Sequence, residues 1–173
     1  MVRQSEHSML PPLSKRFLLS FGTLAGLTYV LITSPYFMKT IFSAYLGTVS
    51  QATAFVLNLL GQHAAATGHL IQSGDFQIEI KYGCDGLDGI LLFALASLSF
   101  PAPLLQKLSG MLGGAISLLL LNGIRIISLF FLGKYWPSMF HFAHVDLWPI
   151  LYVLISLALW LGWAQWAWKR HDT

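Results

Sequence analysis

Three residue types in the second half of the chain could together perform acyl-transfer chemistry: a cysteine, an arginine and a pair of histidines. Cys84 is the only cysteine, Arg125 lies inside the apolar run 113–132, and His141 and His144 precede the last apolar run. A histidine can take the proton of a thiol and later protonate a leaving amine, while an arginine can hold a developing oxyanion or a substrate carbonyl. Acyl transfer is expected if the fold brings these residues to one membrane depth.

Arg125 is costly to place, because a charge at the centre of a membrane helix costs roughly 2.5 to 3.5 kcal/mol on insertion scales. No other charged residue occurs within the run 113–132, and Asn122 lies one helical turn before the arginine. A functional role is the default reading of such an arginine. The alternative is a structural ion pair with Asp85 or Asp88. Asn122 is expected to brace Arg125 or the backbone.

The surroundings of Cys84 allow two readings, an inert packing residue or a reactive thiol. A single cysteine excludes an internal disulfide and every cysteine-paired zinc or redox motif. A position at a helix N-terminus near Arg125 and a histidine is expected to lower the thiol pKa. Asp85 follows directly, and an ionised carboxylate there would oppose thiolate formation unless it faces away or pairs with Arg125. Asp85 can instead cap the helix.

A metal site is the alternative use of the histidines, with Asp146 and Cys84 as further ligands. His141 and His144 are three residues apart in the sequence. A second alternative is that both side chains form hydrogen bonds at the membrane interface. We expect neither a metal nor any other cofactor.

The elements that position these residues belong to an integral membrane protein. The chain is 55% hydrophobic and only 10% charged. Its cations are scattered singly at the ends of apolar runs, which argues against a nucleic-acid-binding stripe. We predict an all-α membrane fold in one domain with about four transmembrane helices. The predicted crossings are 17–33, 84–100, 111–133 and 147–168.

Two further elements are predicted outside these spans. Residues 36–60 are too polar for an easy span, and apolar positions recur there at helical spacing, which favours an amphipathic helix at the interface or packed against the bundle. These positions are Phe37, Ile41, Tyr45, Thr48, Ala52, Phe55 and Leu59. Residues 69–82 alternate with period two around the turn signal Ser73-Gly74-Asp75, which predicts a small β-hairpin leading into Cys84.

The distribution of lysine and arginine predicts the orientation. Residues 1–16 would form a cytoplasmic tail, and 17–33 would be a retained anchor, since a small-x-small cleavage site is lacking. If 36–60 does not cross the membrane, both termini lie on the cytoplasmic side and the Cys84 thiol lies on the outer side. The inner cations are then Arg3, Lys15, Arg16, Lys107, Lys169 and Arg170, against Lys39, Lys81 and Lys134 outside.

Three short segments, in their order along the chain, carry a family resemblance. They are Cys84-Asp-Gly-Leu, Asn122-Gly-Ile-Arg125-Ile and Phe140-His-Phe-Ala-His144. They resemble the exosortase/archaeosortase family of membrane cysteine transpeptidases over Gly74 to about Tyr152. The family often has Cys-Ser-Gly-Ile at the first segment, and here Asp85 departs from it. The small size resembles the compact exosortase H type.

The resemblance implies roles and partners. Cys84 would be the nucleophile, Arg125 the cation that orients the substrate or stabilises the oxyanion, and His144 the base, with His141 as a second candidate or a substrate contact. Similar proteins cleave C-terminal sorting signals of the PEP-CTERM kind on secreted proteins, made of a short motif, a transmembrane helix and a basic tail. The acyl acceptor is left open. The implied location is the bacterial inner membrane, with the site at the outer, periplasmic side.

Two readings from other classes stay open at this point. A small anion transporter or channel would use Arg125 to bind its cargo, and its flux would survive loss of Cys84. A membrane assembly protein without enzymatic activity would tolerate alanine at Cys84, Arg125 and His144 together.

Overall fold

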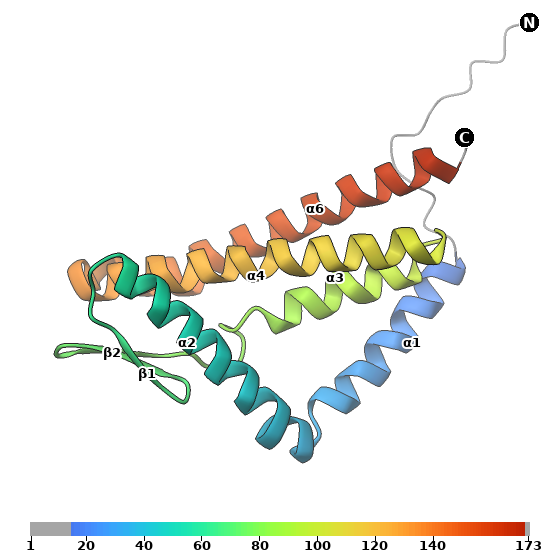
Figure 1. Cartoon of the computed structure of the whole chain (residues 1–173). Helices are drawn as coiled ribbons and strands as arrows, with labels where there is room; N and C mark the ends of the chain where they lie inside the picture. The colour runs from blue at the N-terminus through green and yellow to red at the C-terminus, as the bar shows by residue number, and fades with distance from the viewer. Residues whose placement is uncertain (1–14, 172–173) are drawn as a thin grey trace, which may run out of the picture.

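The computed structural model describes residues 15–171, a set of apolar helices with a small antiparallel sheet at one end (Figure 1). The predicted fold class, an all-α membrane protein with a small β element, is confirmed. Residues 1–14 of the predicted tail lie outside the described part of the chain. In chain order the elements are α1 (Lys15–Ile32), the π-helical η1 (Phe37–Phe42), α2 (Ser43–Leu59), β1 (Ala65–Thr67), β2 (Leu70–Ser73), β3 (Phe76–Glu79), α3 (Leu87–Ser99), α4 (Leu104–Tyr135), α5 (Pro137–Phe142), the π-helical η2 (Ala143–Leu147) and α6 (Trp148–His171).

Within these residues, four helical stretches are long and apolar enough to cross a membrane. They are Lys15–Ile32, Phe37–Leu59, Leu104–Tyr135 and Pro137–Arg170. Three of them overlap the predicted spans 17–33, 111–133 and 147–168. The fourth predicted span, 84–100, corresponds to α3, whose 13 residues reach only about 20 Å, short of the roughly 30 Å hydrocarbon core. The segment predicted as interfacial, 36–60, has spanning length instead, and its membrane position stays a prediction.

A sharp bend separates α1 from α2, and the two helices form a V in Figure 1. The Ser34 hydroxyl accepts a hydrogen bond from the Phe37 amide at 3.3 Å, and Pro35 follows as the first residue of the new helix. A serine cap with proline behind it starts a helix in a new direction. The second arm therefore runs from the bend towards the end of the molecule that carries the sheet.

The buried face of α2 only partly follows the apolar spacing expected from the sequence, because Leu46, Ala54 and Leu57 are buried together with Ser50 and Thr53. Ser50 is fully buried, whereas Phe55 is 65% exposed. The Ser50 hydroxyl donates to the Leu46 carbonyl of its own helix, which removes the cost of burying it. Other polar residues of the segment, such as Thr48 and Gln51, are exposed. The amphipathic, interfacial character expected for 36–60 stays a prediction.

The sheet is a three-stranded antiparallel meander in the order β1-β2-β3, rather than a two-stranded hairpin. Ser73 pairs with Phe76 across the predicted Gly74-Asp75 turn, and β1 adds a strand that the sequence did not suggest. Ile71 and Ile80 are buried beneath it against Phe130 of α4. The sheet therefore anchors the chain that enters the Cys84 loop.

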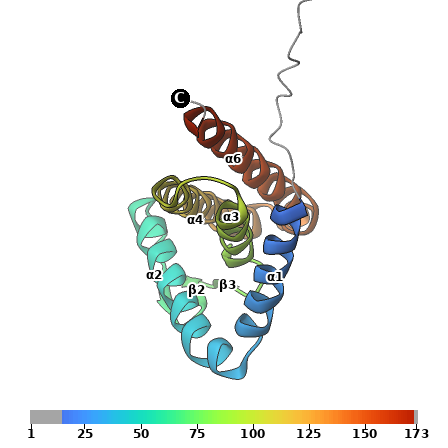
Figure 2. The same cartoon turned by 90° about the vertical axis from the view of Figure 1, so that its right-hand side faces the viewer.

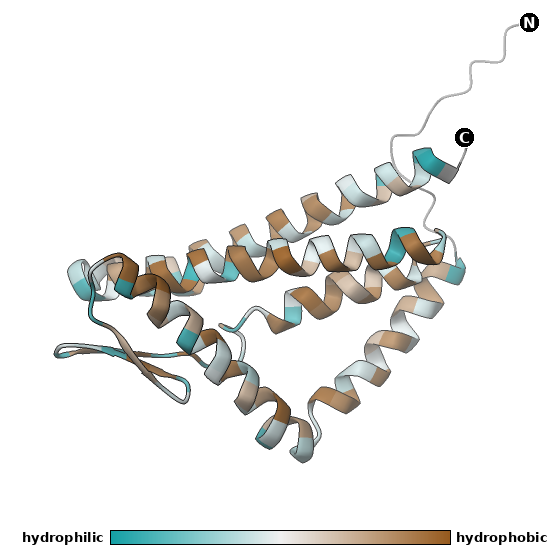
Figure 3. Cartoon of the chain, in the orientation of Figure 1, coloured by the Kyte–Doolittle hydropathy of each residue, from teal (hydrophilic) through white to brown (hydrophobic). Residues whose placement is uncertain are grey.

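Four helices, α1, α3, α4 and α6, form the core on the other side of the molecule. Figure 2 shows α3 between α1 and α4, and α6 lies above α3 and α4 in this view. A Cβ atom on Gly114 would overlap the Phe93 ring, so glycine allows α3 and α4 to approach closely there. Brown, apolar segments dominate these helices in Figure 3, where outward-facing leucines, valines and isoleucines are exposed.

The two ends of the molecule differ in charge. The start of α1, the start of α4 and the end of α6 share one end, while the sheet and α5 occupy the other (Figure 1). The first end carries Lys15, Arg16, Lys107, Lys169 and Arg170. This distribution agrees with the predicted arrangement of inner cations, and the membrane side itself stays a prediction.

Candidate functional site

Cys84 lies in the short loop between β3 and α3. Its amide donates to the Lys81 carbonyl at 2.9 Å, and the glycines on either side, Gly83 and Gly86, adopt φ angles of 84° and 81°. A Cβ atom on Gly86 would come within 2.8 Å of the Asn122 side chain. Both the left-handed backbone and the close approach require glycine there. The loop that carries Cys84 thus packs closely against α4.

The structure brings Cys84, Arg125 and His144 together from three separate elements. The Cys84 Sγ atom lies 3.6 Å from Nε2 of His144 and 3.7 Å from Nη2 of Arg125. Arg125 also donates through Nη1 to the Gly83 carbonyl at 3.5 Å. A thiol, a ring nitrogen within reach of its proton and a fixed cation are the groups that acyl transfer needs.

His144 is held in place by the irregular helix that carries it. The π-helical segment η2 interrupts the path from α5 to α6, and the Phe140 ring stacks on the imidazole at 5.6 Å with an interplanar angle of 12°. Single π-helical turns are frequent at functional sites because they re-aim side chains. His141, by contrast, lies on α5 with an exposed side chain. The geometry favours His144 over His141 as the partner of the thiol.

Asp85 caps the start of α3. Its carboxylate accepts hydrogen bonds from the Gly83 amide at 2.9 Å and the Leu87 amide at 2.8 Å. Burial raises the pKa of this carboxyl above its usual range, although these backbone hydrogen bonds oppose the shift. Asp85 thereby satisfies the first amide of α3, although the N-cap residue of this helix is Gly86.

Arg125 has no carboxylate partner among the described residues. The ion pairs within 15–171 join Glu79 to His69 and to Lys81, on the exposed sheet. Arg125 is only 5% exposed, and its Nε atom is buried without a hydrogen-bond partner. The alternative of a structural pair with Asp85 or Asp88 is therefore not what the structure contains. A buried guanidinium with free donor capacity is available to a ligand.

Three side chains fix the backbone around the thiol, and two of them escaped the sequence analysis. Asn122 and Tyr45 each donate to the Asp85 carbonyl at 2.8 Å, and Tyr152 donates to the Gly86 carbonyl at 3.1 Å. Asn122 braces the backbone, as expected. A buried tyrosine needs a hydrogen-bond partner for its hydroxyl. The presence of Tyr45 and Tyr152 in apolar helices was therefore the sequence feature that could have identified them.

The electrostatics of the thiol differ from the expectation of a lowered pKa. Burial raises the pKa of Cys84 above its usual value, Arg125 pulls it down, and the Asp85 carboxylate raises it. The sequence placed Cys84 at a helix N-terminus, yet α3 begins at Leu87 after Gly86, so the thiol lies outside the first turn, where the helix dipole is strongest. Burial thus opposes thiolate formation at Cys84, and the Arg125 charge favours it.

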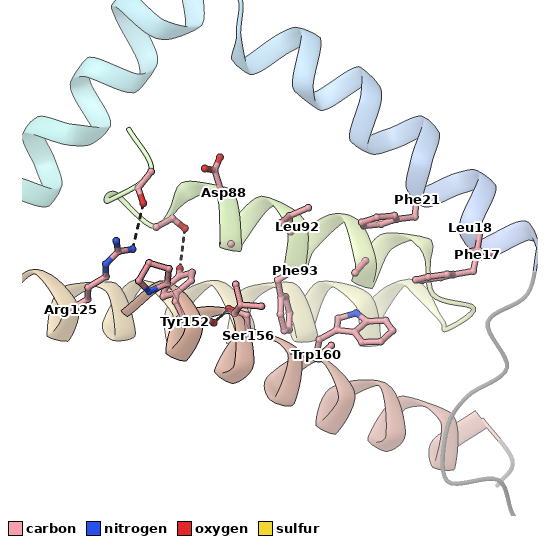
Figure 4. Close-up of a pocket in the computed structure, with 17 residues that line it drawn as sticks. Phe17, Leu18, Phe21, Asp88, Leu92, Phe93, Arg125, Tyr152, Ser156 and Trp160 are labelled. Atoms are coloured by element: carbon pink, nitrogen blue, oxygen red, sulfur yellow. Dashed lines mark hydrogen bonds between the residues drawn. The ribbon is translucent and has the colours of Figure 1, made fainter. Parts of the chain in front are cut away.

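A cavity of about 640 Å³ opens beside the site and extends along the helices (Figure 4). Gly83 and Arg125 line one end, and Phe17 and Trp160 line the other. Among residues 15–171, no group of three or more histidine, cysteine, aspartate or glutamate side chains is placed to hold a metal ion. The arrangement suits a reaction at the thiol with an apolar ligand alongside.

Comparison with known proteins gives one match. The family model described as Transmembrane exosortase (Exosortase_EpsH) matches residues 13–163 of this 173-residue chain. Neither the curated proteins nor the solved structures contain a match. The matched segment includes Cys84, Arg125 and His144, and family membership supports a multi-pass membrane protein with a transpeptidase-like role. The chain belongs to the transmembrane exosortase family.

Proposed function

We propose that this protein is a cysteine transpeptidase or protease that cleaves C-terminal sorting signals of secreted proteins through a thioacyl-enzyme on Cys84. The observation that carries the proposal is the contact of one sulfur atom with both His144, at 3.6 Å, and Arg125, at 3.7 Å. The proposed substrate has a short motif, a transmembrane helix and a basic tail. The reaction takes place at the outer, periplasmic side of the inner membrane, and water or another nucleophile accepts the acyl group.

The first half-reaction forms the thioester. The Cys84 sulfur attacks the scissile carbonyl carbon while His144 takes the thiol proton, and the carbonyl oxygen acquires negative charge. Arg125 stabilises that charge, since its guanidinium is buried and fixed beside the sulfur. The C–N bond then breaks, and His144 returns the proton to the leaving amine. The leaving fragment is the transmembrane helix with its basic tail.

The second half-reaction regenerates the thiol. An acceptor nucleophile loses its proton to His144, attacks the thioester carbonyl and expels the sulfur, which recovers the proton. Because burial raises the pKa of Cys84, the thiol is mostly neutral before the substrate arrives. Proton transfer to His144 therefore accompanies attack. This assigns His144 an obligatory role at neutral pH.

A reporter experiment tests the function. A secreted reporter carries the C-terminal tail of a protein from the same genome, with a short motif, an apolar stretch of about 20 residues and terminal basic residues. We expect processing by the parent and none with Cys84→Ala, Arg125→Ala or His144→Ala, each of which still inserts. Leu120→Ala, on the outward face of α4, is the matched control. Processing by all three site variants would contradict the proposal and favour an assembly role.

Anion transport is the alternative that Arg125 supports, because its Nε atom is free and buried. A transporter predicts anion flux into vesicles that persists in Cys84→Ala and stops in Arg125→Ala. The cavity beside Arg125 is lined mainly by apolar side chains, which is unfavourable for a hydrated ion. We therefore retain acyl transfer as the proposal.

A further inference from the structure

The cavity beside the thiol is a lateral groove with three helices as its walls. Phe17 and Phe21 of α1 form one wall, Val153 and Trp160 of α6 form the other, and Leu92 of α3 lies between them (Figure 4). The lining extends from Gly86, just before α3, to Ala96 on α3, which is ten residue steps, or about 15 Å along a helix. The groove is therefore as long as two to three turns of an apolar helix.

The groove is polar at one end and closed at the other. Arg125 and Asp88 lie at the end that Gly83, the neighbour of the thiol, also lines. At the far end the rings of Phe17 and Trp160 approach to 6.0 Å between centroids and close the passage. A ligand that fills the groove therefore places its polar end beside Arg125 and Gly83, the neighbour of Cys84, and its apolar part towards Trp160.

The groove is also open to the lipid along its length. Leu92 is 54% exposed and Val153 is 64% exposed, although both line it. A membrane-embedded ligand can enter sideways without separating the helices. Packing of side chains between apolar helices, rather than expulsion of water, then provides the affinity.

We propose that this groove receives the first two to three turns of the substrate's transmembrane helix, with the N-terminus of that helix against Asp88. The inference rests on the proposed function and deepens it by naming a docking site and an orienting residue. The first amides of a helix lack partners within the helix and carry partial positive charge, so they favour a carboxylate. Asp88 supplies it at the polar end, where its only described hydrogen bond comes from the Tyr82 hydroxyl at 3.0 Å.

This orientation matches the chemistry at the thiol. The residues just before the substrate helix fall beside Gly83 and Arg125, so the scissile carbonyl comes within reach of the Cys84 sulfur. The Phe17–Trp160 closure directs the rest of the substrate helix out of the groove into lipid. Adjoining parts of one site thereby bind the polar motif and the apolar helix of the substrate.

Photocrosslinking in the Cys84→Ala background tests the docking site without requiring turnover. A photoreactive phenylalanine replaces Leu92 or Val153, and Leu120, which is 65% exposed on α4 and does not line the groove, is the matched control position. The probe is a biotinylated tail peptide of the kind used in the reporter. At both groove positions we expect adducts with the first ten apolar residues of the peptide. Their yield should be about ten times the yield at Leu120, which corresponds to a binding free energy about 1.4 kcal/mol more favourable than that of non-specific contact. Asp88→Asn should lower that yield about two- to fivefold.

The outcomes separate this inference from the proposed function. Processing of the reporter by the parent, with groove adducts no more abundant than at Leu120, would overturn the docking site and leave the enzyme intact. Adducts of the groove positions with lipid instead of peptide would overturn it as well. Groove adducts without any processing would support the docking site and contradict the enzyme. An unchanged yield in Asp88→Asn would overturn the orienting role of Asp88.

Discussion

Replacing Arg125 with glutamine should raise the pKa of the Cys84 thiol. The Arg125 Nη2 atom lies 3.7 Å from the sulfur. At an effective dielectric constant of about 20, unit charges at that distance interact by about 4.5 kcal/mol. Cys84 is only partly buried, so water screens this attraction, and we take about 1.4 to 4 kcal/mol of it as lost in the variant. We therefore expect the thiol pKa to rise further above its usual value, from which burial has already raised it.

The assay is alkylation of the thiol by iodoacetamide across pH in detergent or lipid. Cys84 is the only cysteine, so every adduct reports on it, and Cys84→Ala provides the blank. A thiol of higher pKa has a smaller thiolate fraction but a more nucleophilic thiolate, with a Brønsted coefficient of about 0.5. The two effects combine to slow alkylation at fixed pH by about 3- to 30-fold.

Arg125→Lys is the matched control for the charge. A lysine keeps the positive charge without the planar fork, so the pH profile should lie closer to that of the parent than the glutamine profile does. Far-ultraviolet circular dichroism checks that all variants keep their helices. An unchanged thiol pKa in a folded Arg125→Gln protein would refute the electrostatic coupling on which the proposed mechanism depends.

Three further changes have expected outcomes. Asp85→Asn removes a charge that raises the pKa of Cys84, and the asparagine oxygen can still accept a hydrogen bond from the Leu87 amide. The same alkylation assay should therefore show a lower thiol pKa, and an unchanged or higher thiol pKa would contradict this. His144→Ala should lower the single-turnover cleavage rate of a tail peptide by about 10²- to 10⁴-fold near pH 7, and a smaller loss would argue against a proton-transfer role. Gly114→Leu would drive a side chain into the Phe93 ring and should destabilise the protein by about 1 to 3 kcal/mol in thermal unfolding, whereas Gly113→Leu, which has open space, is the control.

The site was more predictable from the sequence than the membrane arrangement. Residue types limited the chemistry, because one cysteine and one membrane arginine leave few alternatives, and the order of Cys84, Arg125 and His144 pointed to the family. The alternating pattern of 69–82 located the turn before the loop. Long-range contacts such as that of Tyr45 with the Asp85 carbonyl join residues 40 positions apart and leave no local pattern.

Where the structure differs from the sequence expectations, the causes are physical. Burial on α2 follows its long-range partners, which no local spacing specifies, so Ser50 is buried while Phe55 is exposed. Within 84–100 the helix begins only at Leu87, which leaves 13 residues, and whether this segment crosses the membrane stays a prediction. The burial that opposes a lowered pKa at Cys84 arises from tertiary packing, which the sequence does not specify.

The most direct test of the account is detection of a thioester on Cys84. The parent protein is mixed with a tail peptide and quenched in acid within the first turnover, and its intact mass is measured. The account predicts an adduct equal in mass to the peptide fragment before the scissile bond, located on Cys84, released by hydroxylamine and absent from Cys84→Ala. Cleavage of the peptide by Cys84→Ala at the parental rate, or an adduct on another residue, would contradict it.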